Sequence, residues 1–182
     1  MIISKKSRGE GFLLLKRLQK VWSSTKKEIV FSLNLNAVSN NQIYFEDIKP
    51  IKLKKNIIKK WIKQLINNEL KQTGEISVIF CSDSFLLEMN KKYLEHDYFT
   101  DIITFDYVVN DIISGDLFIS IDRIKENSEK FGKSFKNELV RVIFHGVLHL
   151  AGYKDKADAE QKLMRAKEDF YLKAVDFSEM EL

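Results

Sequence analysis

Cysteine, proline and histidine are scarce in this 182-residue chain, which has one cysteine, one proline and three histidines. A single cysteine excludes an internal disulfide and is compatible with a reducing cytosol. Cys81 ends an apolar run and is expected in a buried strand. No apolar stretch approaches the length that spans a bilayer, and the first residues have no clear secretory cleavage site. We therefore expect a cytoplasmic protein that does not associate with a membrane.

Positive charge is concentrated at the start of the chain. Residues 1–36 hold eight Lys or Arg against two Glu, which leaves 22 basic and 24 acidic residues in 37–182. We expect residues 1–36 to be a basic N-terminal appendage, in which residues 12–21 would suit a short amphipathic helix. Residues 37–182 are long enough for a single domain with one core.

Strand-like and helical hydrophobic patterns alternate along this domain. Strands are expected at residues 42–46, 76–81, 100–108 and 116–121, and helices at residues 51–72, 83–93, 122–131, 134–151 and 157–175. The last two strands flank a short connection, so we expect them to pair. This order predicts an α/β (α+β) fold, in which a small mixed β-sheet packs against several helices.

Residue types that are common at helix ends suggest where some of these helices begin and end. The first helix would follow Pro50 and end at Thr73-Gly74, and Ser82 would cap the second. Lysines of the first helix would form a basic face, which either meets phosphate or is merely solvated. The last helix would present an apolar face made by Leu163, Ala166, Phe170 and Ala174.

Two of the three histidines, His145 and His149, are four residues apart on an expected helix, so both imidazoles project from one face. Gly152 can end this helix in a left-handed turn, which would return Asp155 to the histidines. Two imidazoles, one carboxylate and an open fourth position form a ligand set that zinc accepts in catalytic sites. The alternatives are a packed histidine pair in the core, and Asp155 as the N-cap of the last helix.

The residue after the first histidine bears on the reaction. The spacing of the two histidines, Gly152 and Asp155 matches that of the metzincin peptidases, with an oxygen ligand in third place. Zincin peptidases carry a glutamate directly after the first histidine, where it serves as general base. Gly146 occupies that position here. The sequence thus predicts a metal centre without the usual peptidase base.

Three blocks of sequence resemble the YbeY family. His-Gly-Val-Leu-His-Leu-Ala-Gly-Tyr at residues 145–153 resembles the family signature, and Ser-Gly-Asp-Leu-Phe-Ile at 114–119 resembles its Leu-Gly-Asp-Ile strand. The stretch from Asn90 to Phe105 is similar to the family segment Asn-x-x-Tyr-Arg-x-x-Asp-x-Pro-Thr-Asp-Val-Leu-Ser-Phe. The blocks occur in the family's order and spacing.

The resemblance implies a single-domain metal-dependent endoribonuclease of bacterial type. We expect cleavage of single-stranded ribosomal RNA in 16S rRNA 3′ maturation and ribosome quality control. The expected cofactor is one zinc ion per chain, held by His145, His149 and Asp155. The expected partners are ribosomal RNA and the small ribosomal subunit, without a stable protein partner.

The chain departs from the family pattern at two positions. Asp155 replaces the usual third histidine, and Leu94 replaces an arginine expected to meet RNA phosphate. Other residues would then bind substrate, and the candidates are Thr100, Asp101, Lys91, Lys92 and His96. The first two of these would equally suit a turn and a capped strand start.

Two other functions remain open from the sequence. Leu94 favours a catalytically weak ribosome-assembly factor whose metal stabilises the fold. A zincin-like metallopeptidase is disfavoured by Gly146. No residue is assigned as the general base.

Overall fold

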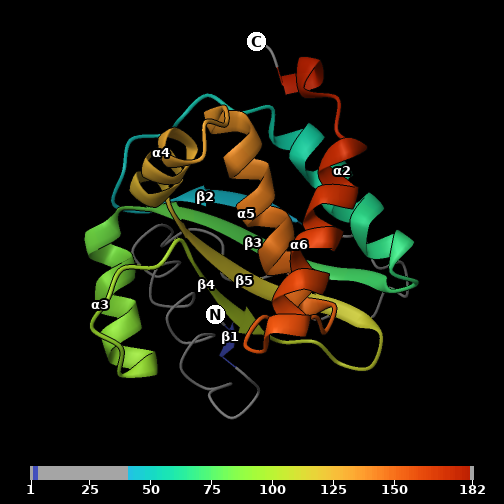
Figure 1. Cartoon of the computed structure of the whole chain (residues 1–182), viewed down its shortest axis with the longest axis horizontal. Coiled ribbons are helices and arrows are strands. Elements are labelled where there is room, and N and C mark those ends of the chain that lie inside the picture. Colours follow the sequence, from blue (N-terminus) through green and yellow to red (C-terminus); the bar gives the residue numbers. More distant parts are fainter. Residues whose placement is uncertain (1, 4–40, 181–182) are drawn as a thin grey trace, which may run out of the picture.

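A mixed five-stranded sheet forms the centre of the computed structural model, which describes residues 2–3 and 41–180 (Figure 1). The strands are β1 (Ile2–Ile3), β2 (Gln42–Phe45), β3 (Gln72–Cys81), β4 (Ile102–Asp106) and β5 (Ile112–Ser120). Their order is β1-β4-β5-β3-β2, with β2, β3 and β5 parallel to one another. β4 pairs antiparallel with β5, as expected, and β1 runs parallel to β4. The predicted fold class is confirmed.

Five α-helices surround the sheet in the described part of the chain. They are α2 (Lys55–Asn68), α3 (Asp83–Leu94), α4 (Ile121–Lys130), α5 (Phe135–Leu150) and α6 (Asp158–Lys173), and a 3-10 helix, η2 (Phe177–Met180), follows them. Ser82, as predicted, caps α3 by accepting a hydrogen bond from the amide of Phe85. No helix within residues 41–180 is long and apolar enough to cross a membrane.

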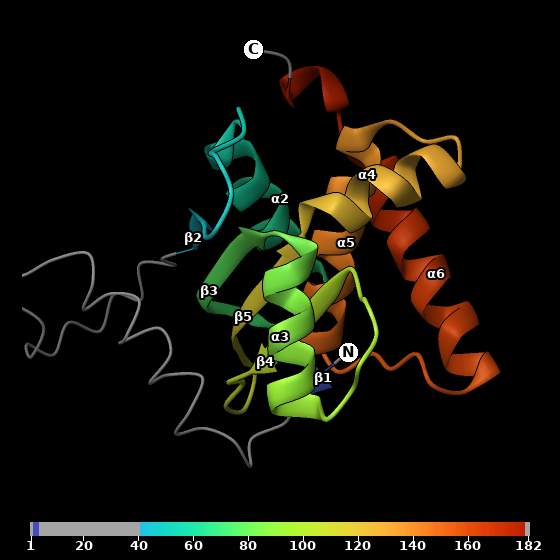
Figure 2. The same ribbon diagram turned by 90° about the vertical axis from the view of Figure 1, so that its left-hand side faces the viewer.

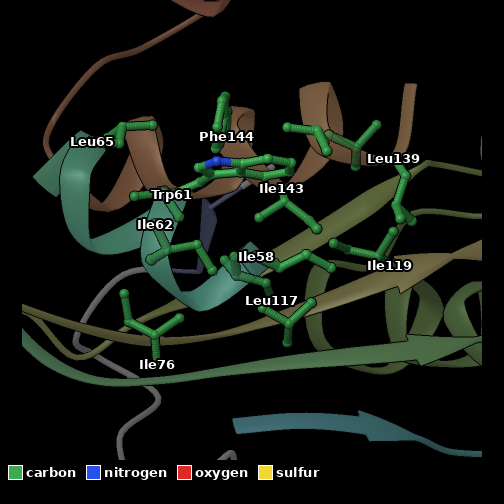
Figure 3. Packing of buried hydrophobic residues seen from close by; sticks show 14 of the residues in the cluster. Ile58, Trp61, Ile62, Leu65, Ile76, Leu117, Ile119, Leu139, Ile143 and Phe144 are labelled. Atoms are coloured by element: carbon green, nitrogen blue, oxygen red, sulfur yellow. The ribbon is translucent and has the colours of Figure 1, made fainter. Parts of the chain in front are cut away.

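Alternating side chains of the strands bury both faces of the sheet. In β3, Val78 and Phe80 join the larger cluster, while Ile79 and Cys81 join the smaller one. The larger cluster lies under α2 and α5, where Trp61 and Phe144 pack above the strands (Figure 3). α3 covers the smaller cluster on the opposite face. Figure 2 shows α6 on the outer side of α5, away from the sheet, so α5 is packed from both sides.

The first predicted helix is wrong at both ends. It starts at Lys55 rather than 51, and it ends at Asn68. Leu70 adopts a left-handed conformation with φ 57°, and the amide of Lys71 donates to the carbonyl of Ile66, which closes the helix as glycine usually does. Thr73-Gly74 lies instead within β3. This helix end could not be predicted from a glycine, because a leucine occupies position 70.

The predicted apolar face of the last helix is also wrong. α6 buries Met164, Glu168 and Tyr171, whereas Leu163, Ala166, Phe170 and Ala174 are exposed. Glu168 is buried because α5 supplies charged and imidazole partners for its carboxylate. The face that packs against α5 is therefore not the most apolar one.

The basic appendage predicted for residues 1–36 lies outside the described residues, apart from Ile2–Ile3 in β1. The short helix predicted at residues 12–21 also lies outside them.

Candidate metal centre

Helix α5 places both histidines on one face. The hydroxyl of Ser134 accepts from the amide of Asn137 at the start of this helix. At its end, Gly152 has φ 105°, and the amide of Tyr153 donates to the carbonyl of Leu148. Only glycine adopts this φ without strain, so the chain reverses there as the sequence predicted.

The reversal brings Asp155 back to the histidines. Its Oδ2 lies 3.6 Å from Nε2 of His145 and 3.5 Å from Nε2 of His149. One ligand atom from each residue lies within 4.8 Å of the other two. Asp155 is not the N-cap of α6, since Ala157 takes that position. The three residues predicted to hold a metal therefore converge.

The remaining nitrogen of each imidazole is held by the protein. Nδ1 of His149 donates to the carbonyl oxygen of Tyr153 at 2.9 Å, because a carbonyl can only accept. Nδ1 of His145 lies 2.6 Å from Oε1 of Glu168. Both Nε2 atoms therefore point toward the carboxylate of Asp155. Histidine ligands of metals are usually oriented in this way by carboxylates or carbonyls.

One buried nitrogen of the site has no hydrogen-bond partner among the described residues, and a bound metal ion would supply one. The His149 side chain is 2% exposed, and its Nε2 receives no hydrogen bond from the described residues. Burial lowers the pKa of His149 to about 4, and the nearby His145 acts in the same direction. His149 is therefore neutral at physiological pH, the form that binds metals. A buried nitrogen lone pair of this kind fits a metal ion.

Tyr153, which holds His149, is fixed in turn by a second hydrogen-bond group. Its hydroxyl donates to Glu69 at the end of α2 over 2.8 Å. The same carboxylate accepts from Lys167 at 2.9 Å and from the hydroxyl of Tyr171. The loop that carries Asp155 is thereby tied to both α2 and α6.

Glu168 belongs to a charged network that the sequence did not predict. Arg141 donates to Glu168 at 3.2 Å, to Asp101 at 3.3 Å, and twice to the buried Glu138 at 2.8 Å. Burial alone would raise the pKa of Glu168, but the hydrogen bond from His145 and the charge of Arg141 lower it. Glu168 is therefore an ionised acceptor for His145.

A pocket of about 290 Å³ opens beside this network, and its lining includes Arg141, His145, Asp155 and Arg165. The acidic groups around it are Asp101, Glu138, Asp155 and Glu168, and the basic ones are Arg141 and Arg165. Among these side chains, four carboxylates outnumber two guanidinium groups by two negative charges. A divalent cation would balance them.

Glu168→Gln is expected to weaken metal binding by about 10- to 100-fold, because it removes the charge that orients His145. Competition with a chromophoric chelator measures the affinity. The matched control is Asp169→Asn, which removes the neighbouring, exposed carboxylate of α6 and should bind metal like the unaltered protein. Equal affinities for the two variants would remove Glu168 from the site.

Gly146 faces the sheet rather than the candidate metal centre. A Cβ atom built on it would lie 2.6 Å from Cδ1 of Ile102 and 2.9 Å from Cδ2 of Leu117. Helix α5 can approach β4 and β5 so closely because this position has no side chain. The glycine thus has a packing role, and the position offers no room for the glutamate of a peptidase.

The substrate-binding candidates are not brought together. The hydroxyl of Thr100 donates to the carbonyl of Ile102 at 3.3 Å, which agrees with the alternative of a capped strand start. Asp101 is linked to the site through its hydrogen bond with Arg141. Lys91 pairs with Asp97 at 2.8 Å, Lys92 lies over the ring of Tyr93, and His96 stacks on Tyr98. The two lysines belong to α3, across the sheet from α5.

Leu94 also lies at this far face. Half-buried, it packs against the smaller core cluster beneath α3, which includes Ile79 and Phe118. The leucine is therefore accounted for by packing.

A family model described as Endoribonuclease YbeY matches residues 18–176. The chain belongs to the YbeY family. Endoribonuclease YbeY of Flavobacterium psychrophilum is 54% identical over 62% of this chain and 81% of its own length. The YbeY protein of Parabacteroides distasonis is 49% identical over 69% of this chain and 89% of its own. These identities confirm the family resemblance read from the three blocks.

The fold is shared with a solved structure. The solution structure of TM1509 from Thermotoga maritima matches with a TM-score of 0.55 and 26% identity, over 76% of this chain and 90% of that one. Glu168 was missed in the sequence because the helical period assigns Leu163, Ala166, Phe170 and Ala174, rather than Glu168, to the packed face of α6.

Proposed function

We propose that this chain is a metal-dependent endoribonuclease that cleaves single-stranded ribosomal RNA in the cytoplasm. Its substrate would be the 3′ precursor of 16S rRNA within the small ribosomal subunit, with a further part in ribosome quality control. Residues 37–182 would form the hydrolase domain. The observation that carries the proposal is the convergence of His145, His149 and Asp155, with one buried imidazole nitrogen unsatisfied, in a YbeY chain.

Zinc is the metal that we propose for this site. Imidazole nitrogen and carboxylate oxygen are both zinc ligands, and three protein ligands leave a fourth position open. When bound, the ion would supply positive charge that polarises a phosphoryl oxygen and offsets charge developing in the transition state.

The residues of the chain would prepare this chemistry in three ways. Glu168 and the carbonyl of Tyr153 hold the imidazoles so that both Nε2 atoms point to one place. Arg141 keeps Glu168 ionised and fixed between α5 and α6. The pocket beside Asp155 would admit the scissile phosphate while the helices keep the ligands rigid.

A peptidase function is disfavoured by the packing of Gly146 as well as by its identity. The position directly after the first histidine faces Ile102 and Leu117, so a base placed there would be buried against the sheet. Removal of a proton in this site would have to use another group. RNA offers its own 2′-hydroxyl next to the scissile phosphate, which a peptide lacks.

The test compares RNA and protein substrates directly. The full chain loaded with zinc should cut a 16S rRNA fragment that contains the 3′ precursor, and it should leave casein intact. His145→Ala should cut neither. RNA that is bound without being cut would instead support an assembly factor, and cleavage of casein would support a peptidase, and either result would overturn the proposal.

A further inference from the structure

Arg165 stands apart from the other charged residues around the pocket. It lies on the face of α6 that also carries Gln161 and Glu168, four residues before it and three after it. Met164 and Glu168 are buried on this helix, whereas Arg165 is exposed at the pocket. Its side chain therefore reaches the pocket from the solvent side.

The guanidinium group of Arg165 is available for a ligand. No acidic side chain of residues 41–180 pairs with it. Arg141, the other arginine of the pocket, is already bonded to Glu138, Glu168 and Asp101. Of the two arginines, only Arg165 has a guanidinium group that can pair with an incoming anion without breaking an existing ion pair.

The chemistry of arginine indicates which anion this would be. A guanidinium group is planar and presents paired N–H donors that match two oxygens of one phosphate. Leu94 supplies no charge, and the lysines of α3 lie across the sheet, so a cation beside the metal ligands has to come from another element. α6 provides one.

We propose that Arg165 forms, with the metal ligands, a subsite for a backbone phosphate of single-stranded RNA. This inference rests on the proposed function and adds the residue that holds the strand. A phosphate in the pocket would lie between the metal ligands on α5 and its loop and the guanidinium of α6. Arg165 would thereby fix the register of the strand against the cleavage site.

The test measures RNA binding and its dependence on salt. Arg165→Gln should bind a single-stranded RNA oligonucleotide about tenfold more weakly, since one charge-assisted contact is lost. The slope of log affinity against log salt should become shallower by about 0.7, the value for one phosphate on a single strand. Arg165→Lys should keep most of the slope, because the charge remains.

Lys173→Gln is the matched control, because it removes an exposed positive charge from the same helix at a residue that does not line the pocket. Its affinity and salt slope should equal those of the unaltered protein, and zinc content should be the same in all variants. If the unaltered chain cuts RNA but Arg165→Gln binds like it, the subsite is wrong and the function stands. If the unaltered chain neither binds nor cuts RNA, both fall.

Discussion

His149→Ala is expected to reduce bound metal from one ion per chain to almost none. Three protein ligands leave little redundancy, and the lost nitrogen is the buried one that receives no hydrogen bond from the described residues. Elemental analysis of the dialysed, zinc-loaded protein measures the content. His96→Ala is the matched control, since it removes the third histidine of the chain, which stacks on Tyr98. Full metal content in His149→Ala would exclude this site.

Gly146→Glu is expected to destabilise the protein by several kcal/mol and to create no peptidase. The new side chain would enter the contact of α5 with Ile102 and Leu117, and its carboxylate would be buried against the sheet without a partner. Urea denaturation followed by circular dichroism measures the loss. A stable variant that cuts casein would show that this position faces the metal after all.

Two causes contribute to that loss of stability, overpacking against Ile102 and Leu117 and burial of an unpaired carboxylate. Gly146→Ala separates them. It adds only the Cβ atom, whose overpacking costs about 1–3 kcal/mol, while alanine in a helix interior recovers about 1 kcal/mol relative to glycine. The ends of Ile102 and Leu117 are flexible, so we expect a net loss well below that of Gly146→Glu.

The convergence of His145, His149 and Asp155 was predictable because their placement is local. The two histidines lie one helical turn apart, and Gly152 reverses the chain three residues before Asp155, so spacing alone decides the geometry. The strands were also predictable from local sequence, because side chains on both faces of the sheet are buried and the strands are therefore rich in apolar residues. The mixed sheet and the convergence of His145, His149 and Asp155 could therefore be predicted from the sequence.

The orienting residues were not predictable, because tertiary packing selects them. Glu168 is 23 residues from His145 and lies on a helix that leaves Leu163 and Phe170 exposed while it buries Glu168. Leu70 ends α2 in a conformation that leucine rarely adopts. The substrate candidates on α3 follow a motif, yet their helix covers the face of the sheet opposite to α5. Linear spacing carries no information on which face of a sheet a helix covers.

The measurement that tests the central claim most directly is RNA cleavage by protein that is stripped of metal and then titrated with zinc. We predict that cleavage of the 16S rRNA fragment stops on stripping, returns in proportion to added zinc, and levels off at one equivalent per chain. Asp155→Ala at the same zinc concentration should stay inactive. Cleavage that survives complete removal of the metal, or full recovery in Asp155→Ala at one equivalent, would contradict a catalytic metal held by His145, His149 and Asp155.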